Sequence, residues 1–371
     1  MMSEKWLYFF NILVSHWVNA LGPGGLQYSM RPSTPEKPFP GKPNGQGRER
    51  PKLPIKSILV VKWDEIGDMA AAVHVFGTLK SAHPEAELHV LCKPFVATLL
   101  AGDLAIDKVI TNIDYWQQRY DVVVELRGTW QTLRKSLSLR TMPKYRVDRG
   151  WIRFLQRGAQ PHEVVTNERI IRSLVGEGIP IAKRQLFPSE AEVAEVWVWT
   201  DWALNDADCP GYAILHTGAR RELRRWPLER FVALSKWLLS EKKLIPIWVG
   251  TADEESQLDE AFAMGAAGKK WVAPEGSSLL SFYAFIASSK LYVGNESGPL
   301  QLADIAEVPL VAIYGPGVPD VFYPQITRSR VLHEVLYCNP CDQIHCVRPS
   351  DRCVDRISLA SVQLAVSEVL A

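Results

Sequence analysis

The sequence predicts an α/β protein with two Rossmann-like domains that face each other across a cleft, preceded by an N-terminal extension. Its 371 residues suffice for two domains that each bury a core of their own. From residue 55 onward, short apolar runs alternate with helical patterns, which is typical of parallel sheets covered on both faces. Pro188 and the turn-rich segment 205–211 interrupt this alternation and separate two units of similar size. Clefts between such units commonly bind ligands.

The elements that we predict follow one another in a regular order. In the first unit, strands are expected at 58–61, 87–92, 108–110 and 121–125, and helices at 69–82 and 94–100. In the second unit, strands are expected at 211–216, 244–250, 291–293 and 310–314, and helices at 228–240, 254–264, 279–288 and 299–305. We place the boundary within 186–210 and predict an extension at 1–54 and domains at 55–190 and 191–371.

The extension differs in composition from the rest of the chain. Residues 5–21 are aromatic and apolar, but Asn11, His16 and Asn19 make this segment too polar and too short to span a bilayer. A signal peptide is one interpretation. An amphipathic helix that lies on a membrane surface, or packs on the protein itself, fits better. Residues 22–54 are rich in Pro, Gly, Arg and Lys, which indicates a flexible tether.

Overall composition excludes some partners. The chain is 47% hydrophobic and 22% charged, which is ordinary for a globular protein, and its formal net charge is +1. This charge provides no general attraction to nucleic acid, so we expect no nucleic-acid partner and look for basic sites locally. One such site is the Arg/Lys-rich stretch from 127 to 157, which suits an acidic or phosphorylated partner but is also compatible with an ordinary solvated face.

Asp68 is the main candidate for a catalytic residue. It lies in the loop between the first predicted strand and its helix, where open α/β sheets bind their ligands. A helix N-terminus keeps a carboxylate ionised, so Asp68 is placed to act as a general base. The alternative is that Asp68 only caps the helix.

Two loops of the second unit suit a phosphorylated ligand. The first, 216–227, follows a strand and offers Thr217, a glycine and four arginines, which can pair with phosphate oxygens. In the second, Ser297 and Gly298 precede a helix opened by Pro299, so that free backbone N–H groups point toward an anion. A solvated basic loop and an ordinary helix start are the alternatives.

These motifs together resemble glycosyltransferase family 9, the lipopolysaccharide heptosyltransferases and their relatives, which have the GT-B fold. The resemblance runs from about residue 56 to the C-terminus and rests on four segments in order: 66–68, 224–227, 295–303 and 314–316. It implies that Asp68 is the general base. It also implies that a nucleotide-sugar is bound by Thr217, Arg224, Arg225, Glu296, Ser297 and Gly298.

The chain departs from the family pattern at three places. It has Glu296 where the family usually has Asp, Gln301 where it has His, and Gly317-Val318 where it has Thr-Asp. Because a glutamate reaches about one bond further than an aspartate, we expect a reshaped sugar pocket. By position alone, Asp253, Glu254 and Ser277 are candidates for contacts with the donor base and ribose.

The implied reaction is an inverting transfer of a heptose or related sugar, with ADP-heptose as the expected donor. Asp68 would deprotonate an acceptor hydroxyl that attacks the anomeric carbon. Arginines and the helix N-terminus would offset the charge of the leaving diphosphate, so that no cofactor or metal ion is required. The acceptor would be a lipopolysaccharide-type or other lipid-linked glycoconjugate held by Lys62, Arg127 and Arg134. We therefore expect a cytoplasmic enzyme of cell-envelope synthesis, peripheral on the inner face of the membrane.

Four of the six cysteines are close in sequence: Cys338, Cys341, Cys346 and Cys353. Four thiolates at such spacing can bind zinc, and packed or redox-labile thiols are the other interpretation. Two further functions stay open: a nucleotide-sugar epimerase of the same fold, and a non-catalytic protein that binds sugar nucleotides.

Overall fold

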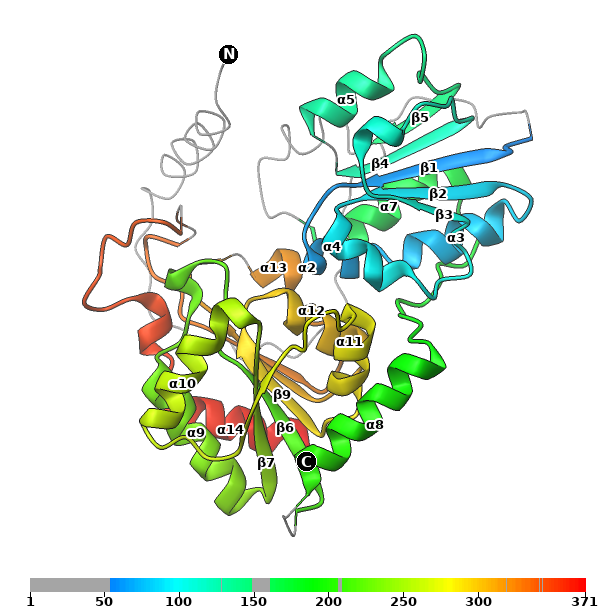
Figure 1. Cartoon of the computed structure of the whole chain (residues 1–371). Coiled ribbons are helices and arrows are strands. Elements are labelled where there is room, and N and C mark those ends of the chain that lie inside the picture. Colours follow the sequence, from blue (N-terminus) through cyan, green and yellow to red (C-terminus); the bar gives the residue numbers. More distant parts are fainter. Residues whose placement is uncertain are drawn as a thin grey trace.

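The computed structural model describes residues 54–127, 129–148, 161–205, 209–317, 319–339, 341 and 343–371. The predicted extension thus lies outside the described residues except for Pro54, as does the end of the basic stretch at 149–157. The described chain forms two α/β units, each with a purely parallel sheet, one above the other in Figure 1. This is the GT-B architecture that the resemblance implies.

The first sheet has the strand order β3-β2-β1-β4-β5. Its strands are β1 (Ser57–Lys62), β2 (Glu87–Cys92), β3 (Lys108–Ile110), β4 (Val122–Arg127) and β5 (Tyr145–Asp148). Its helices are α2 (Ile66–Ala70), α3 (His74–Ala82), α4 (Pro94–Ala97), α5 (Trp130–Ser136) and α7 (Glu163–Val175), with a 3-10 turn η1 (Thr98–Leu100). Strand β1 is central and almost wholly buried, as its run of β-branched and leucine side chains predicts.

The second sheet has the strand order β11-β10-β9-β6-β7-β8. Its strands are β6 (Gly211–His216), β7 (Leu244–Gly250), β8 (Lys269–Val272), β9 (Leu291–Asn295), β10 (Leu310–Tyr314) and β11 (Ser329–His333). Its helices are α8 (Glu190–Leu204), α9 (Leu228–Glu241), α10 (Glu255–Ala263), α11 (Leu279–Ala287), α12 (Gly298–Ile305), α13 (Pro319–Phe322) and α14 (Leu359–Leu370). The loops after β6 and β9, which carry the predicted donor motifs, leave neighbouring strands at the same edge of this sheet.

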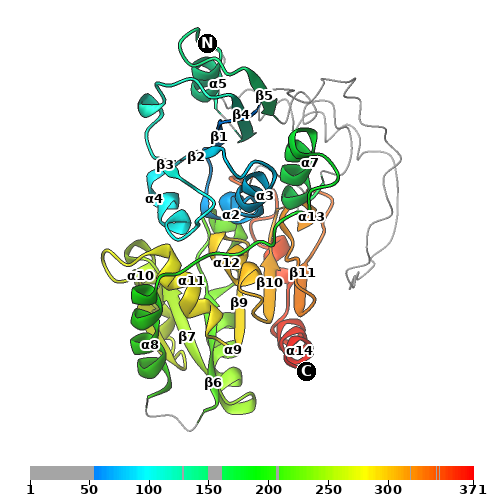
Figure 2. The same cartoon turned by 90° about the vertical axis from the view of Figure 1, so that its right-hand side faces the viewer.

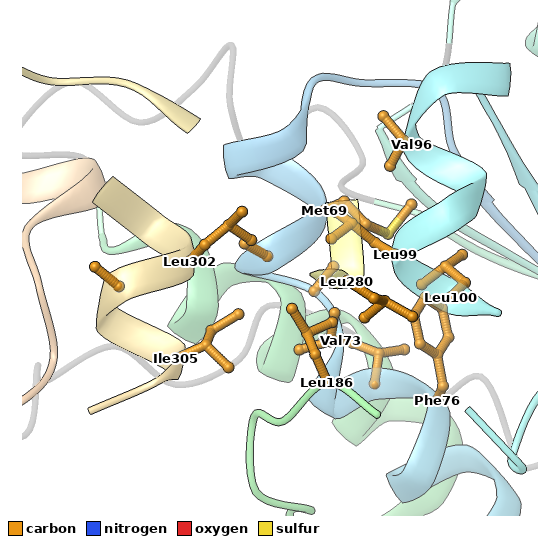
Figure 3. Packing of buried hydrophobic residues seen from close by; sticks show 14 of the residues in the cluster. Met69, Val73, Phe76, Val96, Leu99, Leu100, Leu186, Leu280, Leu302 and Ile305 are labelled. Atoms are coloured by element: carbon orange, nitrogen blue, oxygen red, sulfur yellow. The ribbon is translucent and has the colours of Figure 1, made fainter. Parts of the chain in front are cut away.

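The two units share one apolar core at their junction. Helix α2 packs on α12, and η1 packs on α11. Figure 3 shows Met69 and Val73 of the first unit close to Leu280 and Leu302 of the second. Helix α2 comes directly after the loop that follows β1. The candidate base therefore lies at the junction of the two units rather than on a free surface.

Polar contacts tie the units together further along the chain. The Arg184 guanidinium pairs with the buried Asp304 carboxylate at 2.7 Å. His162 Nδ1 accepts from the Val164 N–H, so that Nε2 carries the proton and donates to the Tyr323 carbonyl at 2.9 Å. Burial lowers the pKa of His162, which keeps this ring neutral.

Two predicted elements need correction. The helix expected over 69–82 is divided, since α2 begins at Ile66 and ends at Ala70, and α3 begins only at His74. The segment 186–210, predicted to break the pattern, contains the fifteen-residue helix α8, which packs on α11. Its apolar residues lie on more than one face, so it lacks the periodicity of an amphipathic helix. Among the described residues, no helix has the length and apolar character needed to cross a membrane.

Candidate active site

Asp68 lies in the first turn of α2, where the dipole of the helix favours a carboxylate. The residue before the helix, Glu65, is extended and makes no side-chain capping bond. Asp68 instead accepts from the Arg127 guanidinium, with 3.1 Å between Nη1 and Oδ1. The simple capping role therefore has no support in this geometry.

A network of charges lies under Asp68. Arg127, at the end of β4, also pairs with Asp64, with 3.2 Å between Nε and Oδ1. The ammonium of Lys62 lies 3.1 Å from Asp64 and 3.2 Å from Glu163. The network thus contains two cations and three carboxylates, which makes its formal charge negative.

This environment raises the pKa of Asp68 above its ordinary value. Burial is the largest cause, followed by the neighbouring Asp64 carboxylate, while Lys62 and Arg127 act in the opposite direction. A carboxyl group with a raised pKa is a better proton acceptor once it is ionised, which suits a general base.

The three residues predicted to hold the acceptor occupy different environments. The Lys62 side chain is 0% exposed, which argues against direct contact with an acceptor and indicates that it positions the network. Arg127 keeps 42% of its side-chain exposure beside Asp68 and is the best placed of the three. Arg134 is exposed on α5.

The N-terminus of α12 faces the N-terminus of α2 across the junction. A Cβ atom built on Gly298 would lie 3.1 Å from Cβ of Ile66, and one built on Gly67 would lie 3.8 Å from Cα of Gly298. The backbones of the two helices therefore approach closely. Ser297 precedes α12, and its hydroxyl lies 3.2 Å from His216 Nδ1 in the other donor loop. The structure thus brings the helix turn that carries Asp68 close to Ser297 and Gly298, the residues predicted to bind an anion.

Arg224 and Glu296, predicted from separate loops, form an ion pair with 3.2 Å between Nη1 and Oε1. Burial raises the pKa of Glu296, and Arg224 opposes this. The second oxygen, Oε2, is buried without a hydrogen bond, and a Cβ on Gly317 would lie 2.1 Å from it. Arg224 Nε also donates to Gln343 Oε1 at 2.6 Å. Gln343 comes from the cysteine-rich segment, and the sequence alone gave no reason to connect it with Arg224.

The remaining donor residues are arranged around the same loops. Arg225 donates to the carbonyl of Ala219 and so shapes its own loop. Thr217 is buried, and its carbonyl accepts from Asn295 Nδ2 at 2.7 Å. Asn295 Oδ1 in turn accepts from the backbone N–H of Trp226 at 3.0 Å. Asn295 therefore joins the two donor loops, a role that its place inside the second motif did not reveal.

The three residues predicted to contact the donor base and ribose differ in how close they lie to the predicted donor loops. The Glu254 carboxylate lies against the first donor loop, since a Cβ on Gly218 would be 1.8 Å from its Oε1. Asp253 is exposed beside it. Ser277 donates to the Pro274 carbonyl at 2.8 Å, and no described contact joins it to the donor loops.

The four clustered cysteines line one pocket, together with residues such as Leu223 and Tyr337. Burial raises the pKa of the Cys353 thiol. Within the described ranges, no group of three or more His, Cys, Asp or Glu side chains is arranged to hold a metal ion. The zinc site that the spacing allows is therefore not assembled in this structure.

Comparisons with known proteins find a matching family model, related sequences and similar folds. Residues 156–350 match the family model described as glycosyltransferase family 9 (heptosyltransferase). Lipopolysaccharide heptosyltransferase 2 of Salmonella typhimurium is 24% identical over 319 residues, covering 74% of this chain and 87% of the relative.

Solved structures of similar fold include two bacterial proteins. The family 9 glycosyl transferase from Veillonella parvula superposes with a TM-score of 0.69 at 17% identity, covering 85% of this chain and 97% of that one. The ADP-heptose lipopolysaccharide heptosyltransferase II of Escherichia coli superposes with a TM-score of 0.65 at 21% identity, covering 85% and 98%.

Proposed function

The chain belongs to glycosyltransferase family 9, and from that premise we propose that it moves a heptose or related sugar from ADP-heptose to a lipopolysaccharide-type acceptor with inversion at the anomeric carbon. The observation that carries this proposal is the meeting of Asp68 with the N-terminus of α12 at the junction of the two units. The donor and acceptor classes are those in the names of the similar heptosyltransferases.

In the proposed reaction, Asp68 takes the proton of an acceptor hydroxyl while that oxygen attacks the anomeric carbon. The bond from this carbon to the diphosphate oxygen breaks, and the diphosphate leaves with the bonding electrons. Inversion follows because base and leaving group lie on opposite sides of the sugar. The raised pKa of Asp68 and its partial shielding from water support this role.

The leaving diphosphate carries negative charge that needs compensation. We assign this to the guanidinium of Arg224 and to the backbone N–H groups at the start of α12, without a metal ion. Glu296 and Gln343 hold Arg224 in place, because each accepts from a different nitrogen of its guanidinium. We further propose that the enzyme works in the cytoplasm.

The test is a measurement of ADP release from ADP-heptose with and without a lipopolysaccharide-core acceptor. The native protein should release ADP only with the acceptor, and Asp68→Asn should lower kcat by roughly 10²–10⁴-fold while the donor still binds. Asp201→Asn, an exposed aspartate on α8, is the matched control.

Four other outcomes would contradict parts of the proposal. Sugar turnover without an acceptor would favour an epimerase, and donor binding without turnover in native protein would favour a non-catalytic role. A product with retained anomeric configuration, seen by NMR, would exclude inversion. If EDTA abolished activity and only a divalent ion restored it, metal independence would be excluded.

A further inference from the structure

Helix α5 buries small polar side chains and exposes large apolar ones, which is the reverse of an ordinary surface helix. The residues that it buries are Thr132 and Ser136, which are small and polar. Thr132 Oγ1 donates to the buried Glu125 carboxylate of β4 at 2.9 Å. By contrast, Trp130 is 71% exposed and Leu137, just after the helix, is 60% exposed. Surface helices normally direct such apolar side chains toward the core.

The turn that follows α5 repeats this arrangement. Thr141 is buried and its hydroxyl bonds to the carbonyl of Lys135 and to Ser138 Oγ, which ties the turn to the end of the helix. Leu139 is 87% exposed on its outer side, and Met142 is 39% exposed. Since the polar groups hold the turn from within, its apolar side chains are displayed to solvent by a fixed backbone.

The same surface is basic. Between residues 128 and 145 the sequence contains Arg134, Lys135, Arg140 and Lys144 and no acidic residue. Lys144 pairs with Asp121 at 2.7 Å, but no described carboxylate lies within ion-pair distance of the other three. Exposed apolar side chains among unpaired cations are the features with which proteins bind the interface of an anionic membrane.

This surface belongs to the unit that carries Asp68 and follows the strand whose last residue contacts it. Helix α5 begins three residues after Arg127, which contacts Asp68. In Figures 1 and 2, α5 lies in the upper part of the first unit, with the second sheet below. A membrane against α5 would therefore contact the acceptor domain and leave the donor domain free to exchange nucleotide.

We propose that α5 and the turn at 137–142 form a docking surface for an anionic lipid bilayer. This inference rests on the proposed function in one respect, because a lipid-linked acceptor would then be presented beside Asp68. Trp130, Leu137 and Leu139 enter the headgroup region, and Lys135 and Arg140 pair with lipid phosphates.

Helix α8 provides a natural comparison within the same chain. It also exposes apolar side chains, with Trp197 at 70% and Val198 at 68%. Its fifteen residues contain four acidic side chains and no Lys or Arg, as the sequence EAEVAEVWVWTDWAL shows. An anionic bilayer would repel this face, so apolar exposure alone does not mark the docking surface.

The test is co-sedimentation of the full chain with vesicles of phosphatidylcholine containing phosphatidylglycerol, and with vesicles of phosphatidylcholine alone. Native protein should prefer the anionic vesicles. Leu137→Ser/Leu139→Ser and Lys135→Glu/Arg140→Glu should each lower the partition coefficient by roughly tenfold or more. Trp197→Ser/Val198→Ser on α8 is the matched control and should bind like native protein. Circular dichroism confirms that each variant folds.

Activity measurements separate this inference from the proposed function. The docking variants should keep native turnover with a delipidated, water-soluble acceptor and lose turnover with an acceptor embedded in vesicles. If native protein transfers no sugar at all, the proposed function fails while the vesicle assay still tests the surface.

Three results would overturn the docking surface. The first is that native protein binds vesicles with and without phosphatidylglycerol equally well. The second is unchanged vesicle binding in both docking variants, as expected if another segment such as the N-terminal extension holds the chain on the bilayer. The third is a native dimer that Leu137→Ser/Leu139→Ser converts to a monomer, which would make this surface an interface between copies.

Discussion

Nη1 of Arg127 lies 3.1 Å from Oδ1 of Asp68, while Nε of the same guanidinium lies 3.2 Å from Oδ1 of Asp64. One arginine therefore bridges the candidate base and a second carboxylate that raises the pKa of that base. The two neighbours influence Asp68 in opposite directions, so they provide a pair of substitutions with opposite expected effects.

The first prediction concerns the pH dependence of kcat/KM. Its acid limb reports the ionisation of the base in the free enzyme, so the raised pKa of Asp68 should place this limb above the ordinary aspartate value of 3.8. Arg127→Gln removes a cation that lowers the pKa of Asp68, and the limb should move to higher pH. Asp64→Asn removes an anion that raises it, and the limb should move to lower pH.

A pH titration of both variants against native protein checks these signs. Shifts in the same direction for Arg127→Gln and Asp64→Asn would show that the acid limb does not belong to Asp68. If the acid limb did not move in either variant, it would likewise not belong to Asp68.

The second prediction concerns stability at Lys62. Its buried ammonium pairs with Asp64 and Glu163, so Lys62→Met leaves two carboxylates without their common cation. Breaking a buried pair in this way should lower the free energy of unfolding by about 3–5 kcal/mol, measured by urea denaturation. Lys62→Met/Glu163→Gln removes one of the two carboxylate charges that lost this cation and should recover part of the loss. A double variant less stable than the single one would contradict the assignment.

The third prediction concerns Gln343 as a positioning residue for Arg224. Its amide oxygen accepts from Arg224 Nε at 2.6 Å, and its backbone φ of 61° is held by an N–H donated to Cys341 Sγ at 3.3 Å. Gln343→Asn tolerates this φ but is too short to reach Arg224. The KM for the nucleotide-sugar should rise roughly tenfold, as expected for the loss of a charge-assisted hydrogen bond, with a smaller change in kcat.

The matched variant is Gln343→Glu, which keeps the length and the accepting oxygen and should retain a KM near that of native protein. In an Arg224→Ala background, Gln343→Asn should have no further effect. An equal loss in both backgrounds would show that Gln343 acts on the fold rather than on Arg224.

The fourth prediction concerns the glycine beneath Glu296. A Cβ on Gly317 would lie 2.1 Å from Glu296 Oε2, so Gly317→Ala must displace the carboxylate that pairs with Arg224. The KM for the donor should rise by roughly the same factor as for Gln343→Asn, since both lose one hydrogen-bonding partner of Arg224. Adding Glu296→Asp, a shorter acid, should restore part of the donor affinity. Strictly additive losses in the double variant would contradict this explanation.

Much of the architecture follows from the sequence because buried parallel strands are continuous apolar runs. Strands such as Gly211–His216 and Leu244–Gly250 match the predicted limits. The short strand β5 was missed, because Tyr145–Asp148 lies at a sheet edge and alternates charged with apolar residues. The division between α2 and α3 was missed because the residues at the break, 71–73, are Ala-Ala-Val and include neither proline nor glycine.

The candidate site was predictable where one motif carries the chemistry. Asp68, Ser297 and Gly298 lie at the helix N-termini that their motifs indicate. Contacts between distant segments were not predictable, because a single sequence does not show which loops meet. Arg224 and Gln343 are 119 residues apart, and Lys62 and Glu163 are 101 apart.

The approach of Gly67 to Gly298 has a consequence for how the enzyme would open. Because α2 rests on α12, the candidate base is held against the opposite domain. If the first unit rotated about this contact, the distance from Asp68 to the donor would change little, while α5 in the outer part of the unit would travel further. In such a rotation the acceptor would be brought to a base that already lies beside the predicted donor loops.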